Sequence, residues 1–352
     1  MARLLTCGWE TGDPNEAGTN FLGPSAEIFA VNSTPVPRAG NWCCRMGINS
    51  ISGADVYKTF NFGARTEVWV RWAAQFRSPQ LAGGTEWMVA RLRDSGGTAV
   101  ACLTYSRVDG FIRARQGGAT NTTLLGTSQS APLLVWHTLE WRHQMTSLTQ
   151  GITELWVNGS QQISFSGDNS AGTLLNVAQL DLGVWGSTRY WWHAVDDLAI
   201  NDTTGAINNG RPGDGRVVLL TPNAVGSSTT WLRLSGPDSG ANWSQVDDNP
   251  MAMTDYVESF TIGDRDLYAV ADLPAITTSV NAVDNLVLAQ AVDVGASLAP
   301  TIKSGTTINE AAASALTTTP AYVRTQYETD PNTSAAWTPA AVNAAEVGIT
   351  AR

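Results

Sequence analysis

The sequence contains few of the residues on which catalytic, metal and nucleic-acid sites usually depend. Among 352 residues there are only three histidines and four cysteines, and of the 21 basic residues only Lys58 and Lys303 are lysines. No cluster of cations occurs along the chain, although the phosphate backbone of a nucleic acid requires one. The formal net charge is −10. We therefore expect no nucleic-acid partner and an acidic surface that favours solubility.

Long apolar runs are also missing. No stretch reaches the length of about 18 apolar residues that spans a bilayer. The chain begins MARLLTCGWETGD, and its apolar stretch is too short for the core of a signal peptide. We expect no membrane insertion, no transmembrane segment, and synthesis in the cytoplasm.

The cysteines match no zinc-binding spacing. They are Cys7, Cys43, Cys44 and Cys102, all in the first third of the chain. Side chains of neighbouring residues in a strand point to opposite faces, so Cys43 and Cys44 do not serve one ordinary site. Buried free thiols are the favoured interpretation, and a disulfide between Cys7 and Cys102 is the alternative.

Strand alternation and turn residues are abundant. Leu155 and Val157 alternate with Glu154 and Trp156. Asn158-Gly159 follows, and the chain returns with the same alternation. Asn-Gly is the pair that best accepts a two-residue type I′ turn, so this is a β-hairpin. Further strands are expected at 66–76, 87–92, 99–105, 110–115, 122–126, 178–184, 194–200 and 217–220. Helical spacing occurs only at 309–316, so the sequence predicts an all-β protein.

Residues 25 to 205 resemble the laminin-G/concanavalin-like jelly roll. The resemblance lies in a strand that begins WHTLEW, the L-W-V-N-G hairpin at Leu155 to Gly159, and the closing D-D-L-A-I strand at Asp196 to Ile200. It implies a jelly-roll sandwich and says little about activity, because one fold hosts many functions.

A glycine-rich stretch, TTGAINNGRPGDG, begins at Thr203 and predicts a domain boundary. The expected organisation is an N-terminal arm or entry strand at 1–24, the jelly roll at 25–207, a linker at 208–216, and a second, smaller β-sandwich domain for attachment or assembly at 217–352. Whether the arm packs on its own domain or exchanges between subunits stays open.

The second region and the N-terminus resemble virion structural proteins of tailed bacteriophages. The N-terminal match is R-L-L-T-C-G-x-E-x-G-D at Arg3 to Asp13. The matching residues of the second region are Asn242, Trp243, Val246, Asp247, Asp248, Pro250, Asp255, Tyr256, Val257, Gly263, Asp264, Asp266, Leu267, Tyr268, Asp330, Pro331, Trp337, Thr338, Val342, Asn343, Glu346 and Gly348. The resemblance implies a virion component, without deciding between head, tail and fibre.

No catalytic constellation is evident in the sequence. Glycoside hydrolases on this fold need paired carboxylates such as E-x-D-x-x-E, whereas Glu140 and Asp181 stand alone. No G-x-S-x-G nucleophile motif occurs. His137 and His143 are interpreted as loop or surface residues. The sequence predicts no enzyme and no catalytic residue.

The sequence predicts no cofactor, and calcium is the alternative, because many laminin-G-like domains bind it. Its candidate ligands are Asp196, Asp197 and Asp202, with Asn201 beside them. The simpler interpretation is that Asp197 hydrogen-bonds the turn before the last strand. The pair Asp247-Asp248 is likewise interpreted as part of a turn.

Aromatic residues give the sharper candidate site. Trp185 is followed by the run Tyr190, Trp191 and Trp192. Consecutive aromatics cannot all be buried on one side of a strand, so at least one should face solvent, a glycan or a partner subunit. Trp72 and Trp141, on regular strands, are expected in the core.

These observations favour a non-enzymatic structural protein of a bacteriophage virion, in a tail, fibre or head-decoration role. Its partners would be other virion proteins and copies of itself. The alternative is a glycan-binding, lectin-like receptor-recognition protein that binds a host surface glycan, and the third interpretation is a polysaccharide-acting enzyme.

Overall fold

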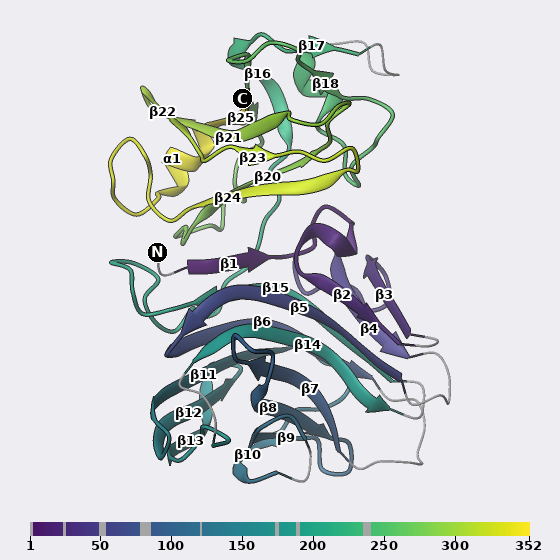
Figure 1. Cartoon of the computed structure of the whole chain (residues 1–352), viewed down its shortest axis with the longest axis vertical. Helices are drawn as coiled ribbons and strands as arrows, with labels where there is room; N and C mark the ends of the chain where they lie inside the picture. The colour runs from purple at the N-terminus through teal and green to yellow at the C-terminus, as the bar shows by residue number, and fades with distance from the viewer. Residues whose placement is uncertain are drawn as a thin grey trace. The chain divides into compact units, whose positions relative to one another are not determined.

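The structure is a computed structural model of the chain, and it describes residues 3–23, 26–48, 54–77, 86–119, 122–172, 176–187, 191–234 and 241–352. The chain divides into two compact units, Met1–Val217 and Val218–Arg352 (Figure 1). Nearly all regular structure is strand. The helices of the described residues are η1 Pro14–Glu16, η2 Asn242–Gln245 and α1 Pro339–Asn343. None of these is long and apolar enough to cross a membrane.

The first unit is a jelly-roll β-sandwich of two antiparallel sheets. The eight-stranded sheet has the order β13-β12-β11-β6-β15-β4-β3, and β1 also pairs with β15. Its strands are β1 Arg3–Cys7, β3 Ala26–Val31, β4 Cys43–Ile48, β6 Glu67–Arg77, β11 His137–Ser147, β12 Gln150–Val157, β13 Ser160–Gly167 and β15 Trp191–Asn201.

The seven-stranded sheet of the same unit has the order β10-β9-β8-β7-β14-β5-β2. Its strands are β2 Thr19–Leu22, β5 Ala54–Arg65, β7 Glu86–Arg93, β8 Ala99–Ser106, β9 Phe111–Gln116, β10 Leu124–Ser130 and β14 Val177–Ser187. Strand β14 pairs with both β5 and β7, which lie far from it in sequence. The order therefore brings three distant segments onto one face.

The core follows from the period-two alternation of the strands. On β6 the side chains of Val68, Val70, Trp72 and Phe76 are all buried between the sheets. Trp141 of β11 joins the same core, so the expectation for Trp72 and Trp141 is confirmed. Burying each large apolar side chain contributes about 1.5–3 kcal/mol to folding.

Several local predictions are confirmed. The hairpin joins β12 to β13 through Asn158 and Gly159, with φ angles of 51° and 80°. Both angles are positive, as a type I′ turn requires. All four cysteines are buried free thiols.

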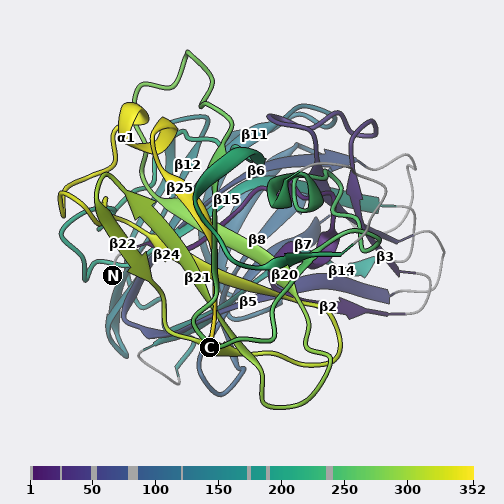
Figure 2. The ribbon, with the colours of Figure 1, turned by 90° about the horizontal axis from the view of Figure 1, so that it is seen from above.

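The second unit combines a six-stranded sheet with smaller two-stranded sheets. The large sheet has the order β16-β19-β25-β21-β22, and β23 also pairs with β21. Its strands are β16 Pro222–Thr229, β19 Arg265–Val270, β21 Ser297–Ser304, β22 Thr307–Glu310, β23 Ser314–Ala315 and β25 Glu346–Ala351. Strands β21, β22 and β25 lie together in Figure 2. The small sheets are β17 Leu232–Arg233 with β18 Val257–Glu258, and β20 Val283–Ala289 with β24 Ala321–Tyr327.

Two sequence predictions fail in this unit. Residues 309–316, with helix-like spacing, instead form parts of β22 and β23, because pairing with β21 outweighs a weak local preference. The expected strand at 217–220 is not formed. The pair β20–β24 is tied to the large sheet by Asn285, whose Nδ2 donates to the carbonyls of Thr301 and Gly348 at 3.0 and 2.9 Å.

Candidate functional site

A buried carboxylate, Asp181, organises the outer face of the seven-stranded sheet in the first unit. Arg91 Nε and Nη2 donate to its Oδ2 at 2.9 and 2.7 Å, and Arg93 Nη2 donates to its Oδ1 at 2.7 Å. Thr59 Oγ1 also donates to Oδ1 at 2.7 Å. The register places Thr59, Asp181 and Arg91 opposite one another on β5, β14 and β7. Two guanidinium groups thus share one carboxylate, which leaves a net positive charge at this point.

Three aromatic rings stand beside this charged centre. The rings of Phe21 and Tyr57 stack with centroids 4.6 Å apart, and Tyr57 stacks on Trp185 at 5.0 Å. The Arg91 guanidinium lies 5.3 Å from the Tyr57 centroid and 5.1 Å from that of Trp185, within cation–π range. We call the set Phe21, Tyr57, Arg91, Arg93, Asp181 and Trp185 the arginine–aromatic face.

A glycine makes room for this stack. Gly183 of β14 lies opposite Tyr57 of β5. A Cβ on Gly183 would stand 2.5 Å from the Tyr57 Cβ and 2.1 Å from the Val56 carbonyl oxygen. Because no side chain fills this position, the Tyr57 ring can approach Trp185 two residues further along β14.

A second charged pair extends the face toward β9. Arg115 Nε and Nη2 donate to the two carboxylate oxygens of Glu86 at 2.9 and 3.1 Å. Thr104 also donates to Glu86. The hydrogen bonds from Arg115 and Thr104 lower the pKa of Glu86 against the opposing effect of its burial. This carboxylate therefore stays ionised, and Arg115 stays paired.

Two buried polar atoms near Asp181 have no hydrogen-bond partner within the described chain. They are Arg93 Nε and Gln179 Oε1, from residues that lie opposite each other on β7 and β14. Buried polar groups are normally satisfied, by water or a ligand where the protein supplies no partner. Polar capacity therefore remains at the centre of the face.

Of the described residues in the predicted aromatic cluster, one belongs to this face. Trp185 does, whereas Trp191 is 2% exposed and packs in the core against Trp87 at 4.6 Å. The expectation that Trp191 contacts a ligand or a partner is therefore not met, because β15 turns its side chain inward. Trp192 is half-buried with the Arg77 guanidinium 5.8 Å from its ring. Tyr190 lies outside the described residues.

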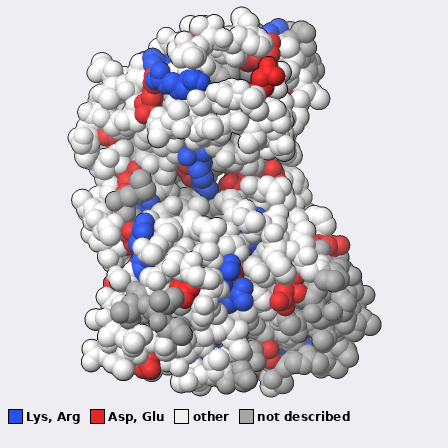
Figure 3. Space-filling view, viewed as in Figure 1, with Lys and Arg blue, Asp and Glu red and all other residues white. Residues whose placement is uncertain are grey.

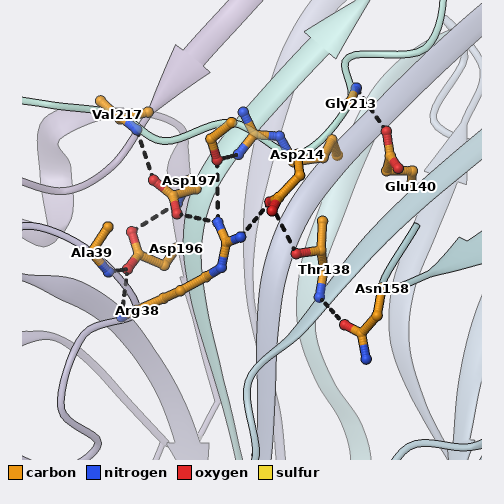
Figure 4. Close-up of polar contacts among 12 residues, drawn as sticks. Arg38, Ala39, Thr138, Glu140, Asn158, Asp196, Asp197, Gly213, Asp214 and Val217 are labelled. Carbon is orange, nitrogen blue, oxygen red and sulfur yellow. Dashed lines mark hydrogen bonds and ion pairs between the residues drawn. The ribbon is translucent and has the colours of Figure 1, made fainter. Parts of the chain in front are cut away.

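The calcium candidates are occupied by the chain itself. Arg38 pairs with Asp197 at 2.8 Å and with Asp214, and its backbone N–H donates to Asp196 at 3.0 Å (Figure 4). Asp202 pairs with Arg65 at 2.7 Å. Among the described residues no group of three His, Cys, Asp or Glu side chains is arranged to hold a metal ion.

The expected linker is instead a strap, residues 203–217, bound to the first unit. Arg211 Nε donates to the buried carboxylate of Glu140 at 2.9 Å. The backbone N–H of Gly213 donates to the same carboxylate at 2.8 Å (Figure 4). The N–H of Val217 donates to Asp197 at 2.7 Å. The glycine-rich composition predicts a linker between domains. In the structure it instead lets the backbone N–H groups donate to buried carboxylates.

The histidine assignment also needs correction. His137 and His143 lie on β11 and are buried, with His143 Nδ1 3.0 Å from Thr153 Oγ1. Burial lowers the pKa of His143 to about 4 and that of His193 to about 3. At neutral pH both are uncharged core residues, and neither lies on the arginine–aromatic face.

The residues that sequence reasoning missed are Phe21, Tyr57, Arg91 and Arg93. Alternation already placed Gln179, Asp181 and Gly183 on one face of a strand, and EWMVARLR alternates in the same way. Charged side chains at outward positions usually indicate a solvated face. The sequence signal is the charge of these two strands. It indicates a site only when the order of the strands in the sheet is known.

Charged side chains elsewhere are sparse. On the view in Figure 3, Lys and Arg side chains lie in small groups close to Asp and Glu, and most of the surface carries neither. This agrees with a charged content of 15%.

Several solved structures are similar to part of this chain at low sequence identity. No family model matches, and no curated protein matches. Among solved structures, cellulose-induced protein Cip1 matches at 14% identity and a TM-score of 0.47, over 60% of this chain and 100% of its own. An endo-β-1,4-glucuronan lyase from the fungus Trichoderma reesei matches at 11% identity and a TM-score of 0.45, over 57% of this chain and 96% of its own. A carbohydrate esterase from the Shiga toxin-encoding bacteriophage phi24B matches at 16% identity and a TM-score of 0.40, over 56% and 97%.

These findings contradict two expectations from the sequence. Several of the matched structures are carbohydrate-active jelly rolls, including alginate lyases. The prediction of a non-enzymatic virion structural protein, and that of no enzyme, are therefore corrected.

Proposed function

We propose that the first unit binds a carboxylate-bearing polysaccharide on the arginine–aromatic face and cleaves it by β-elimination. The observation that carries this proposal is the pairing of Arg91 and Arg93 with one buried carboxylate, Asp181, beside stacked aromatic rings. A guanidinium fork matches a carboxylate in geometry and charge. The C–H face of a sugar ring packs on an aromatic face such as that of Phe21, which is 46% exposed.

The chemistry of elimination matches the residue types present. A base removes the proton beside the uronate carboxyl group, a carbon–carbon double bond forms, and the glycosidic oxygen departs and takes up a proton. The developing charge on the carboxyl group must be offset, which the Arg91 and Arg93 side chains can do. Tyrosine is among the side chains that act as general acid or base. We assign proton transfer to Tyr57, the tyrosine on the described part of this face.

Hydrolysis receives less support from the chain. It needs two carboxylates that divide the roles of acid and base or nucleophile. On the arginine–aromatic face Asp181 is held by two arginines, and the neighbouring Glu86 is paired with Arg115. Both carboxylates are therefore already engaged by arginine side chains.

The test uses the purified full chain with uronate polymers and a neutral glucan as control. Glucuronan and alginate, on which matched lyases act, are the first polymers to try. Product is measured by the ultraviolet absorbance of the unsaturated uronate. Tyr57→Phe keeps the ring stack and removes the hydroxyl, and we expect it to lower the rate by about 10² or more. Tyr256→Phe, in the second unit, should leave the rate unchanged.

Binding is measured separately by affinity electrophoresis in the same polymers. If the polymers bind without unsaturated product, the chain is the glycan-binding protein of the alternative interpretation. If an Arg93→Gln chain that still folds binds and cleaves like the parent, the arginine–aromatic face is not the site. If the chain neither binds nor cleaves any uronate polymer, the proposal is overturned.

We also propose that the protein is carried on a bacteriophage particle, with other virion proteins and copies of itself as partners and a host surface glycan as target. The support is the sequence resemblance at Arg3 to Asp13 and in the second region. Mass spectrometry of purified particles should find the chain in constant stoichiometry with the other particle proteins. Its absence from particles would overturn this part of the proposal and leave the chemistry untouched.

A further inference from the structure

One of the two lysines of the chain is fully buried. Lys58 lies on β5 with an exposed fraction of 0%, between the core residues Val56 and Phe60. Lysine is almost never fully buried unless its amine is paired. The other lysine, Lys303, is partly exposed and paired with Glu346 at 2.8 Å. Lys58 therefore calls for an explanation that surface solubility does not give.

The amine of Lys58 contacts a side-chain amide. Its Nζ lies 2.5 Å from Asn20 Oδ1 and 2.6 Å from the carbonyl oxygen of Pro14. Asn20 and Lys58 are directly opposite in the antiparallel pairing of β2 and β5, so their side chains emerge on the same face of the sheet. Asn20 is held in place because its Nδ2 donates to Asn15 Oδ1 at 2.8 Å. The amide carbon is thus fixed within reach of the amine.

The surroundings favour the reactive, uncharged form of the amine. Burial lowers the pKa of Lys58, and the nearby groups that act in the opposite direction are Cys44, Cys7, Asp13 and Glu16. Lysine acts as a nucleophile only when neutral, and desolvation is one of the ways in which proteins achieve this. Asp13 lies in the turn that also supplies the Pro14 carbonyl, and its carboxylate caps that turn by accepting from Asn15 N at 2.8 Å.

We propose that Lys58 and Asn20 form an intramolecular isopeptide bond. The neutral Nζ of Lys58 attacks the side-chain carbonyl carbon of Asn20, giving a tetrahedral adduct. A proton moves from the attacking nitrogen to the amide nitrogen, which leaves as ammonia, and a secondary amide remains between the two side chains. No oxidant or co-reactant is needed. We assign the transfer of this proton to Asp13, which caps the turn whose Pro14 carbonyl accepts from the Lys58 amine.

The bond would fix the edge of the seven-stranded sheet. Strand β2 is short, lies at this edge, and pairs only with β5. Phe21, the exposed end of the aromatic stack, directly follows Asn20. A covalent link at Asn20 would hold β2 against its own sheet and prevent the N-terminal segment from leaving it. This inference is independent of the proposed polysaccharide chemistry.

The intact mass of the purified full chain tests the proposal. We expect a mass about 17 Da below that of the sequence, since one ammonia is lost. Tandem mass spectrometry of a protease digest should find one peptide pair joined through Lys58 and Asn20. An intact mass equal to that of the sequence, with the two peptides recovered separately, would overturn the proposal.

Variants separate this bond from other reactions that lose ammonia, such as succinimide formation at asparagine. Lys58→Arg should restore the full mass, whereas a succinimide would persist. Lys303→Arg is the matched control and should keep the deficit. Asn20→Asp should form the same bond with loss of water, giving a deficit of about 18 Da, an outcome that a failure to fold cannot produce.

The role of Asp13 has its own test. Asp13→Asn keeps a side chain that caps the turn equally well and removes the carboxylate. We expect the crosslinked fraction in freshly synthesised protein to fall at least severalfold, with the same circular dichroism spectrum. An unchanged fraction would remove Asp13 from the mechanism.

Discussion

The outer faces of the two sheets in the first unit carry similar residues and use them differently. On the eight-stranded sheet, Asp197 and Glu140 are buried carboxylates held by the strap through backbone N–H groups and Arg211. On the seven-stranded sheet, Asp181 is held by arginines of a neighbouring strand. The first arrangement attaches one part of the chain to another, and the second leaves cations and rings at a surface.

The aromatic residues show the same contrast. On the eight-stranded sheet Trp69 and Trp156 lie 5.5 Å apart, and Arg211 of the strap stands 5.0 Å from the Trp156 ring. On the seven-stranded sheet the stack ends on the exposed ring of Phe21. Identical residue types therefore serve stability where the chain covers them and are available for a ligand where it does not.

The largest expected effect is the loss of the strap anchor in the Asp197→Asn variant. Asp197 has a φ of 53°, a conformation that asparagine also adopts readily, so the change removes charge and keeps the backbone. The Arg38 guanidinium then loses its buried partner. Breaking a buried ion pair costs about 3 kcal/mol or more in unfolding free energy, measurable by urea denaturation.

Asp214→Asn is the matched control for that variant. Asp214 pairs with the same Arg38, but its side chain is 69% exposed. Exposed ion pairs contribute about 0–1 kcal/mol, so the control should change stability little. Equal destabilisation by the two variants would mean that the strap is not held mainly through the buried carboxylate.

A smaller effect should appear as a pH dependence of the unfolding free energy, caused by carboxylates near Asp197. Burial, with added repulsion from Asp197 and Glu16, raises the pKa of Glu10 from 4.5 to about 7. The pKa of Asp196 is also raised, by burial and by Asp197. The folded chain therefore keeps a proton on Glu10 that the unfolded chain loses above pH 4.5, so stability is full below that pH and falls as pH rises toward 7.

We expect the unfolding free energy to fall by about 2 kcal/mol between pH 5 and pH 8 through Glu10. Thermal unfolding at several pH values measures this slope. Glu10→Gln should flatten it, because glutamine keeps an acceptor for the N–H of Asn41, which donates to Glu10 at 2.7 Å, and cannot ionise. A variant with the parent slope would assign the dependence to other groups.

The contrast between the two faces could be predicted only in part from the sequence. Alternation gave the strands and placed Asp181 and Gly183 on one face, because the side-chain period of a strand is local. It could not give the neighbours of Asp181, since Arg91 and Arg93 come from a strand about ninety residues earlier, brought there by sheet order. Tyr57 likewise meets Trp185 only through the β5–β14 pairing.

The errors have the same origin. The aromatic run that includes Trp191 is a candidate site in the sequence because its residues are adjacent. Adjacency does not determine which of them faces the core. The glycine-rich stretch at 203–215 predicted a linker, because composition does not reveal that Glu140 and Asp197 are buried acceptors for its N–H groups. Both errors arise where contacts across the fold override a local pattern.

The smallest expected effect compares two exposed phenylalanines, one at the edge of each sheet. Phe21 on β2 is 46% exposed and stacks on Tyr57, whereas Phe29 on β3 is 43% exposed, with the Arg45 guanidinium 5.6 Å from its ring. Truncating either ring removes a similar exposed area, so Phe21→Ala and Phe29→Ala should change stability by similar, small amounts. Aromatic pairs contribute about 0.5–1.5 kcal/mol, so Phe21→Ala should weaken polysaccharide binding about three- to tenfold, while Phe29→Ala leaves it unchanged. Equal binding by both variants would mean that the ligand does not reach the exposed end of the stack and is held by the arginines alone, and weaker binding by Phe29→Ala alone would move the site to the eight-stranded sheet.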